Sequence, residues 1–279
     1  METIWHEEDR ILLQDDRYTY AVLLRILEGE CRLIRTDRKR LILCHSEDPF
    51  PVRIWVPADA GTEEKEATWQ LARELCPLKE GYRYNLRYEL AEYFLQRAAE
   101  EGCPAEIYTN MYAYDCPSPK RPDPAEGSAV RAEEKDLQDV LQMEAAFHRE
   151  LQLDERDWET YREILTNCIA GGMLWLWKDP AGKSVAMCRQ HPVGEISTIS
   201  GVFTLPEERR KHYAENLVWQ MSCLIHEEGR MPMLYTDADY AASNACYEKI
   251  GYVLRGKLCT IGKKEDGHEE DTDRDRHAE

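Results

Sequence analysis

The longest pattern in the second half of the chain begins as a strand and ends as a helix. Residues 195–205, EISTISGVFTL, are rich in β-branched and apolar side chains, which is typical of a strand. Apolar residues then recur at helical spacing up to Ile225, ahead of Gly229. The pattern predicts a strand over 195–205 that runs into a helix over 207–228. The connecting stretch PEERRKHYA carries three consecutive cations and no glycine.

A proline-rich segment, residues 116–128, predicts a boundary between two domains. Four of the 13 prolines fall between Pro117 and Pro124. Proline removes backbone donors and restricts the preceding residue to extended conformations, so the segment is typical of a semi-rigid linker. A chain of 279 residues also exceeds the usual size of one domain. We expect a first domain over 1–115, a linker over 116–128 and a second domain over 129–263.

The elements expected in the second domain alternate between strands and helices. They are a strand at 128–136, helices at 137–152 and 157–170, strands at 173–179 and 183–190, the strand and helix described above, a strand at 231–239, a helix at 242–250 and a closing strand or hairpin at 252–261.

The first domain is predicted to be a smaller α+β unit. Its expected elements are a helix with Tyr20, Leu23, Leu24 and Leu27 on one face, strands at 40–45 and 51–58, a helix ending at about Cys76, a helix over 86–102, and a strand at 105–114.

At the C-terminus, residues 265–279 hold eight acids, two arginines and no large apolar side chain. Such a segment cannot offset its ordering entropy by burial, so we expect a disordered acidic tail over 264–279.

Composition argues against several classes of partner and cofactor. A net charge of −18 argues against nucleic acid or an anionic membrane as the main partner. We expect neither a signal peptide nor a membrane-spanning helix, because no suitable apolar run is present. The ten cysteines are scattered and form no C-x-x-C pair, which disfavours a zinc ribbon. We therefore expect no metal site, and reduced thiols in a cytoplasmic protein.

The cations between the predicted strand and helix indicate an anion site. The first N–H groups of a helix have no partner within the helix, and the helix dipole adds partial positive charge at that end. Cations at such an end are electrostatically disfavoured unless an anion accompanies them. Arg209, Arg210 and Lys211 at this point of a strongly acidic chain therefore favour a phosphate ligand.

Two segments resemble motifs of the GNAT superfamily, N-acetyltransferases that use acetyl-CoA as the donor. Residues 202–214 resemble V-x-T-x-P-E-x-R-x-K-x-Y-A, and residues 243–252 read SNACYEKIGY, with LYTD between the two. The resemblance covers about residues 127–262, and the first half resembles the degenerate GNAT-like domain of some bacterial members. It implies an α+β fold with a mixed, mostly antiparallel sheet flanked by helices, preceded by a smaller α+β domain.

By this resemblance, acetyl-CoA is the co-substrate, with its pantetheine arm along the strand and its pyrophosphate at the helix start. The residues expected to bind it are Val202, Phe203, Thr204, Arg209, Arg210, Lys211, His212, Tyr213, Ala214 and Asn244. The sequence departs from the family at His212, a glycine position, and at Arg210, a frequent glycine. Glycine is favoured where backbone approaches a ligand closely, although a helical dihedral does not require it. Tyr240 likewise stands where the family often has asparagine.

The resemblance also implies that Tyr247 protonates the departing thiolate of coenzyme A. A base must take a proton from the attacking amine, and Glu195 is the candidate on the predicted strand. Asp237 and Asp239 are rival acids that could bind a cationic acceptor. We expect an N-acetyltransferase acting by direct attack on a primary amine of a small molecule or peptide. The alternative is a CoA-binding pseudoenzyme or sensor with a degraded pyrophosphate loop.

Overall fold

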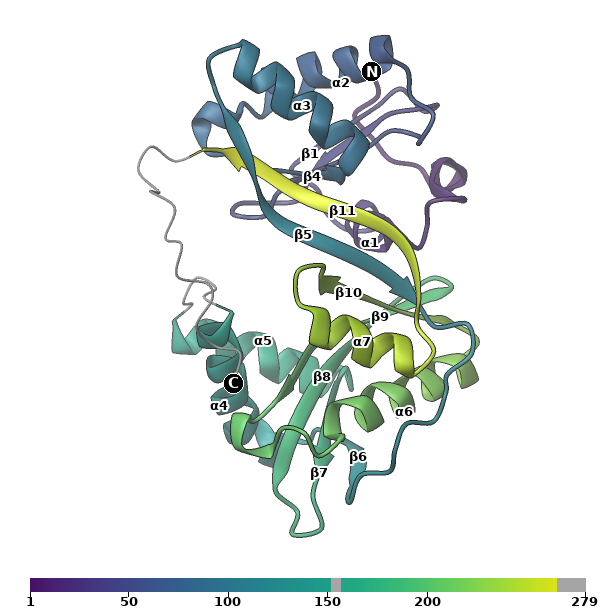
Figure 1. Cartoon of the computed structure of the whole chain (residues 1–279), viewed down its shortest axis with the longest axis vertical. Helices are drawn as coiled ribbons and strands as arrows, with labels where there is room; N and C mark the ends of the chain where they lie inside the picture. The colour runs from purple at the N-terminus through teal and green to yellow at the C-terminus, as the bar shows by residue number, and fades with distance from the viewer. Residues whose placement is uncertain (152–156, 265–279) are drawn as a thin grey trace. The chain divides into compact units, whose positions relative to one another are not determined.

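The computed structural model describes residues 1–151 and 157–264, and contacts divide the chain into two compact units (Figure 1). Unit 1 comprises 1–14, 26–110 and the chain from Lys257 onward, and unit 2 comprises 15–25 and 111–256. These units differ from the predicted domains, because the closing strand contributes to both. The predicted acidic tail lies outside the described residues, apart from Lys264.

Unit 1 is an α+β unit whose sheet has the strand order β1-β2-β3-β4-β11. The β3–β4 pair is parallel and the other pairs are antiparallel. Its elements are a 3₁₀ helix at Glu7–Leu13, strands β1 (Leu33–Thr36), β2 (Ile42–His45), β3 (Val52–Trp55) and β4 (Tyr84–Arg87), helices α2 (Thr62–Leu75) and α3 (Tyr88–Glu100), and a 3₁₀ turn at Leu78–Glu80. The predicted helix at 86–102 was wrong at its start, because Leu86 and Arg87 belong to β4.

Unit 2 is built on the strand order β5-β10-β9-β8-β7-β6. Among the described strand pairs of this unit, only β9–β10 is parallel. Its elements are α1 (Ala21–Leu27), β5 (Ala105–Asp115), β6 (Ser128–Arg131), a 3₁₀ turn at Glu134–Asp136, α4 (Leu137–Glu150), α5 (Trp158–Ala170), β7 (Leu174–Lys178), β8 (Ser184–Val193), β9 (Ile196–Thr204), a 3₁₀ turn at Pro206–Glu208, α6 (Tyr213–Glu227), β10 (Met231–Asp237), α7 (Ala241–Lys249) and β11 (Val253–Lys263). The last residues of α1 and β11, and the first of β5, belong to unit 1. The predicted mixed, mostly antiparallel sheet with flanking helices is confirmed.

Helices cover both faces of the unit 2 sheet, with α4 and α5 on one face and α6 on the other (Figure 1). Leu141, Leu165 and Leu176 share a buried core on the α4 face. Leu217 and Met221 of α6 belong to a second core, on the opposite face. Apolar side chains at i, i+3 and i+4 give each helix one stripe to bury, which explains why the helical periodicity was legible in the sequence.

The proline-rich segment is held against unit 2 by hydrogen bonds. The Lys120 amide donates to the carbonyl oxygen of Ile250 at 2.9 Å. The Asn216 side chain donates to the carbonyl oxygen of Asp123 at 2.8 Å, and Cys116 is fully buried. The described part of this segment therefore packs on the second unit. Its role as a linker between independently folding domains stays a prediction.

Candidate functional site

The sheet of unit 2 opens between β9 and β10. These parallel strands are paired from Ile196 opposite Met231 to Ile199 opposite Leu234. Both strands continue beyond that point, β9 to Thr204 and β10 to Asp237, without further pairing to each other in this register. A pocket of about 610 Å³ lies at the opening, lined by β9, β10, α4, α6, α7 and the loop before α6. A volume of this size is in the usual range for a small-molecule site.

A bulge in β9 shapes the wall of this pocket. Met187 of β8 is opposite Phe203, but Arg189 is opposite Ser200, so two residues of β9 face Cys188 alone. One of them is Gly201, whose φ of +58° is left-handed. Any other residue would be strained by this backbone conformation, and its Cβ would also displace the Arg189 guanidinium, whose Nη2 atom lies 2.6 Å from that position. A bulge of this kind leaves backbone groups outside the strand ladder.

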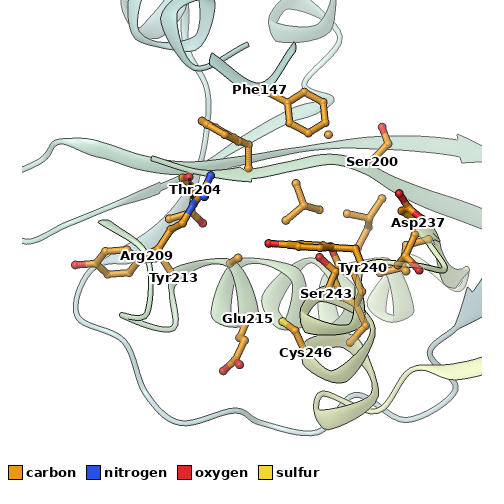
Figure 2. Close-up of a pocket in the computed structure, with 18 of the residues that line it drawn as sticks. Phe147, Ser200, Thr204, Arg209, Tyr213, Glu215, Asp237, Tyr240, Ser243 and Cys246 are labelled. Carbon is orange, nitrogen blue, oxygen red and sulfur yellow. Dashed lines mark hydrogen bonds between the residues drawn. The ribbon is translucent and has the colours of Figure 1, made fainter. Parts of the chain in front are cut away.

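The bulge also determines which residues of β9 beyond Ser200 face α4 and which face α6. Phe203 packs against Phe147 of α4, with ring centroids 5.8 Å apart. Ile199 and Val202 pack with the core beneath α6 instead. Figure 2 shows Phe147 and Ser200 on one side of the long strands, and Ser243, Cys246 and Glu215 on the other. The pocket therefore has an α4 side and an α6–α7 side, and Ser200 faces the first.

The loop before α6 differs from the predicted helix start. The chain forms a 3₁₀ turn over Pro206–Glu208, and α6 begins only at Tyr213. Arg210 and His212 both have left-handed backbone, with φ of 63° and 62°. The expectation that this turn uses helical dihedrals, which do not require glycine, was wrong. Non-glycine residues in this region cost about 1 kcal/mol each or more, so the backbone at Arg210 and His212 is strained.

The three cations of this loop differ in their partners. Arg209 pairs with Glu150 of α4 and its Nε donates to the carbonyl oxygen of Thr204 at 3.3 Å. Lys211 donates to Glu208 at 2.7 Å and does not line the pocket. Arg210 lines the pocket and forms no ion pair with any residue in 1–151 or 157–264. Carboxylates of the protein therefore neutralise Arg209 and Lys211, and Arg210 alone of the three cations has no ion-pair partner in the described chain.

His212 is the residue immediately before α6. Its Nδ1 lies 2.9 Å from a carboxylate oxygen of Glu215 in the first turn of the helix. No side chain caps the N–H groups of this turn. His212, Tyr213 and Ala214 all line the pocket, as the sequence led us to expect.

Tyr247 lines the pocket from α7. Its ring packs edge to face on Tyr252, and its hydroxyl forms no hydrogen bond within the described part of the chain. Burial raises the pKa of the Tyr247 phenol well above its ordinary value, with the neighbouring thiols of Cys246 and Cys188 adding to the shift. The phenol is thus protonated at neutral pH, and its proton is available to a pocket ligand.

Two predicted site residues lie away from the pocket. Glu195 is in the turn before β9, at the opposite end of this strand, where its 68% exposed side chain pairs with Arg17 at 3.2 Å. Its role as a base stays a prediction that this location does not support. Asn244 is buried and donates to the carbonyl oxygens of Asp237 and Ala238, both at 3.2 Å. The amide joins α7 to the end of β10 and does not line the pocket.

Asp237, one of the rival acids, does line the pocket at the end of β10 (Figure 2). One of its oxygens accepts the Asp239 amide at 2.9 Å. Within 1–151 and 157–264, Asp237 has no cationic partner.

The sequence reasoning missed Ser200 and His191. The His191 Nε2 lies 2.9 Å from Ser200 Oγ, and Ser200 lines the pocket. Burial, together with the positive charges of Arg25 and Arg189, lowers the pKa of His191 to about 4. The two residues are nine positions apart on neighbouring strands. No sequence motif signals their contact, because the register of the β8–β9 hairpin creates it.

Comparisons with known proteins identify this architecture. Residues 176–261 match the family model described as FR47-like protein. Solved structures with the same fold include an acetyltransferase from the GNAT family from Colwellia psychrerythraea, at 12% identity and a TM-score of 0.61, covering 94% of this chain and 99% of that one. Another is a GCN5-related N-acetyltransferase from Kribbella flavida, at 17% identity and a TM-score of 0.59, covering 92% and 96%.

A tandem GNAT protein from the clavulanic acid biosynthesis pathway is also similar, at 13% identity and a TM-score of 0.53, covering 95% of this chain and 99% of that one. No curated protein matches the sequence significantly. Among the described residues, none of the helices has the length and apolar content needed to cross a membrane.

Proposed function

Because the chain has the GNAT fold, with an FR47-like segment over 176–261, we propose that it is an acyltransferase that moves an acetyl group from acetyl-CoA to a primary amine. The amine belongs to a small molecule or peptide and attacks the thioester directly in a ternary complex. The observation that carries this proposal is the opening between β9 and β10, with Tyr247 at its wall.

The charges of the pocket suit these two substrates. Three lining carboxylates, Glu150, Glu208 and Glu215, pair with cations or with His212 of the protein. The two charged lining residues without an ion-pair partner in the described chain are Arg210, in the loop before α6, and Asp237, at the end of β10. An anionic pyrophosphate suits the first position and a cationic amine the second.

The start of α6 is suited to the pyrophosphate. Among the described residues, no side chain accepts a hydrogen bond from the first N–H groups of α6, so these groups are available to an anion. The carboxylate of this first turn, Glu215, lies 2.9 Å from the His212 imidazole. We therefore assign acetyl-CoA binding to unit 2, with Arg209 and Arg210 at the pocket wall, Asn244 as a supporting residue, and Lys211 off the wall.

The chemistry asked of the protein has two parts. When the amine nitrogen bonds to the acetyl carbon, negative charge develops on the carbonyl oxygen, and backbone N–H groups at the β9 bulge are the type of donor that stabilises it. The carbon–sulfur bond then breaks, and the Tyr247 hydroxyl donates its proton to the thiolate. The amine loses its own proton to a base or to water. Metal is not required by this scheme.

Titration of the full-length protein with acetyl-CoA tests the proposal. Calorimetry should give saturable binding, and ligand at about 100 times its Kd should stabilise the fold by about 2.7 kcal/mol. Arg210→Ala should weaken binding, whereas Arg230→Ala should not, because Arg230 pairs with Glu228 outside the pocket. No binding at millimolar acetyl-CoA would reject the proposal.

A CoA-binding sensor without turnover is the second candidate. The two left-handed non-glycine residues of the pyrophosphate loop, Arg210 and His212, favour it. The two functions separate in one experiment: a sensor binds acetyl-CoA but transfers no acetyl group to a broad panel of primary amines, while an enzyme does both.

A further inference from the structure

The α4 side of the pocket contains a polar group that the proposed chemistry has not used. Ser200 is the first residue of β9 beyond the paired segment with β10, and its side chain faces the α4 side (Figure 2). Phe147 and Phe203 line the pocket on the same side. The α6–α7 side holds the residues suited to acetyl-CoA, so an acceptor reaches the opening from the α4 side.

His191 holds the Ser200 hydroxyl at 2.9 Å from behind. A hydroxyl has one proton and two lone pairs. If the Nε2 atom accepts the hydroxyl proton, both lone pairs of Ser200 remain available. If Nε2 donates instead, one lone pair remains. Either tautomer of His191 therefore leaves Ser200 Oγ able to accept a hydrogen bond from an amine.

The neutral state of His191 matters for a cationic ligand. A positive charge on the imidazole would lie directly behind Ser200 and repel an ammonium group. Burial keeps the His191 ring neutral, and the nearby cations Arg25 and Arg189 add to this effect. Arg189 is itself paired with the buried Glu144 at 3.1 Å. The charge of Arg189 is thus compensated, and the ring presents no added charge to the pocket.

We propose that Ser200 binds the acceptor amine as a hydrogen-bond acceptor and that His191 is the positioning residue that orients the Ser200 hydroxyl. This inference rests on the proposed acetyltransferase function and assigns its acceptor side. No bond forms to Ser200. Its role is to hold the amine nitrogen while the nitrogen attacks the acetyl carbon.

The test measures acetylation of methylamine and 2-phenylethylamine by the full-length protein at saturating acetyl-CoA. Ser200→Ala should raise the KM for both amines about tenfold or more, as expected for a lost hydrogen bond to a charged group. The Kd for acetyl-CoA should change less than twofold. Ser200→Thr keeps the hydroxyl and should retain most of the activity. Ser197→Ala is the matched control, because Ser197 is on the same strand with a buried hydroxyl that has no described partner.

A second measurement separates positioning from a merely structural role. His191→Gln keeps a neutral hydrogen-bonding group, whereas His191→Leu does not, so the KM should rise only in the leucine variant. In the CoA-bound parent, the imidazole ¹⁵N signals of His191 should shift when the amine is added, and this shift should vanish in Ser200→Ala. An unchanged amine KM in Ser200→Ala, or no shift in the active parent, overturns the inference. Binding of acetyl-CoA without acetylation of these two amines or of any member of the broad panel of primary amines instead overturns amine acetylation itself, and the assignment of Ser200 with it.

Discussion

Tyr247 packs edge to face against Tyr252, with ring centroids 5.9 Å apart and an interplanar angle of 63°. Tyr252 is in turn fixed by Ser222, whose hydroxyl lies 2.7 Å from the Tyr252 hydroxyl in the buried core. The contact gives the Tyr247 phenol a rigid support while its own hydroxyl stays without a partner in the described chain. Precise placement is what a weak acid needs if it is to protonate a thiolate efficiently.

Tyr247→Phe is therefore expected to lower turnover by roughly 10²- to 10⁴-fold, the usual contribution of positioned acid catalysis. The Kd for acetyl-CoA should change little, because the lost hydroxyl has no partner in the described protein. Steady-state kinetics measure the turnover, and calorimetry measures the Kd for acetyl-CoA. Tyr252→Phe is the matched control: it loses the Ser222 contact and should lower the free energy of unfolding by about 1 kcal/mol, with a much smaller effect on turnover. Equal turnover in Tyr247→Phe and the parent would remove Tyr247 from the mechanism.

Arg210→Ala should weaken acetyl-CoA binding by about tenfold, because a charge-assisted contact to phosphate contributes roughly 1.5 kcal/mol or more. The loss should shrink as salt is raised, since Arg210 is exposed. Lys211→Ala is the control, because Lys211 pairs with Glu208 and lies off the pocket wall. Arg209→Ala is also expected to loosen binding, through loss of its contacts with Glu150 and Thr204. If the lysine variant binds more weakly than the Arg210 variant, the roles assigned within this loop are reversed.

His212→Gly should raise the free energy of unfolding by up to about 1 kcal/mol, because glycine adopts the left-handed backbone of this position without strain. The loss of the contact with Glu215 opposes this gain and is small at a half-exposed site. Acetyl-CoA binding is expected to tighten, since the imidazole no longer crowds the start of α6. Denaturant unfolding and calorimetry measure the two effects. Weaker binding in the glycine variant, worsening at low pH, would mean that the imidazolium is a phosphate ligand.

The stability of the protein should fall as the pH drops from about 6.5 to 4, in part through His191. Burial and two nearby arginines lower the pKa of His191 to about 4. The unfolded chain binds a proton at His191 near pH 6.5, while the folded chain does not, so unfolding takes up a proton in this window. The contribution is present above pH 6.5 and is lost toward pH 4. His191→Gln should therefore flatten the pH dependence between these values by about 2–3 kcal/mol. Parallel curves for parent and variant would show that His191 titrates normally.

The periodicity of single elements was readable from the sequence, and local backbone geometry was not. Strand β10 and helix α7 match their predicted positions within two residues, because β10 has a run of apolar residues and α7 ends just before Gly251. The start of α6 was placed six residues early, because PEERRK consists of a proline and good helix formers. In the structure Arg209 is extended and Arg210 is left-handed, and this breaks the helical path.

The candidate site was predictable only where its residues belong to one segment. Residues 202–204 and 212–214 line the pocket as expected, because they follow one another along β9 and into α6. The contact between His191 and Ser200 depends on the register of the β8–β9 hairpin, in which His191 is opposite Thr198 and diagonal to Ser200. Glu195 shows the same limit, because the sequence does not tell which end of the strand opens into the pocket.

The exchange of strands between the units has a consequence for synthesis on the ribosome. Strand β4 of unit 1 is complete by Arg87, but its antiparallel partner is β11, whose Leu258–Ile261 are made only after residues 111–256 of unit 2. Cys259 and Ile261 are fully buried in the unit 1 core. A nascent chain in which synthesis has passed Asn110 but not yet reached β11 therefore still lacks part of that core. Unit 1 cannot close until unit 2 has been translated, in contrast to the usual order in which the domain made first folds first.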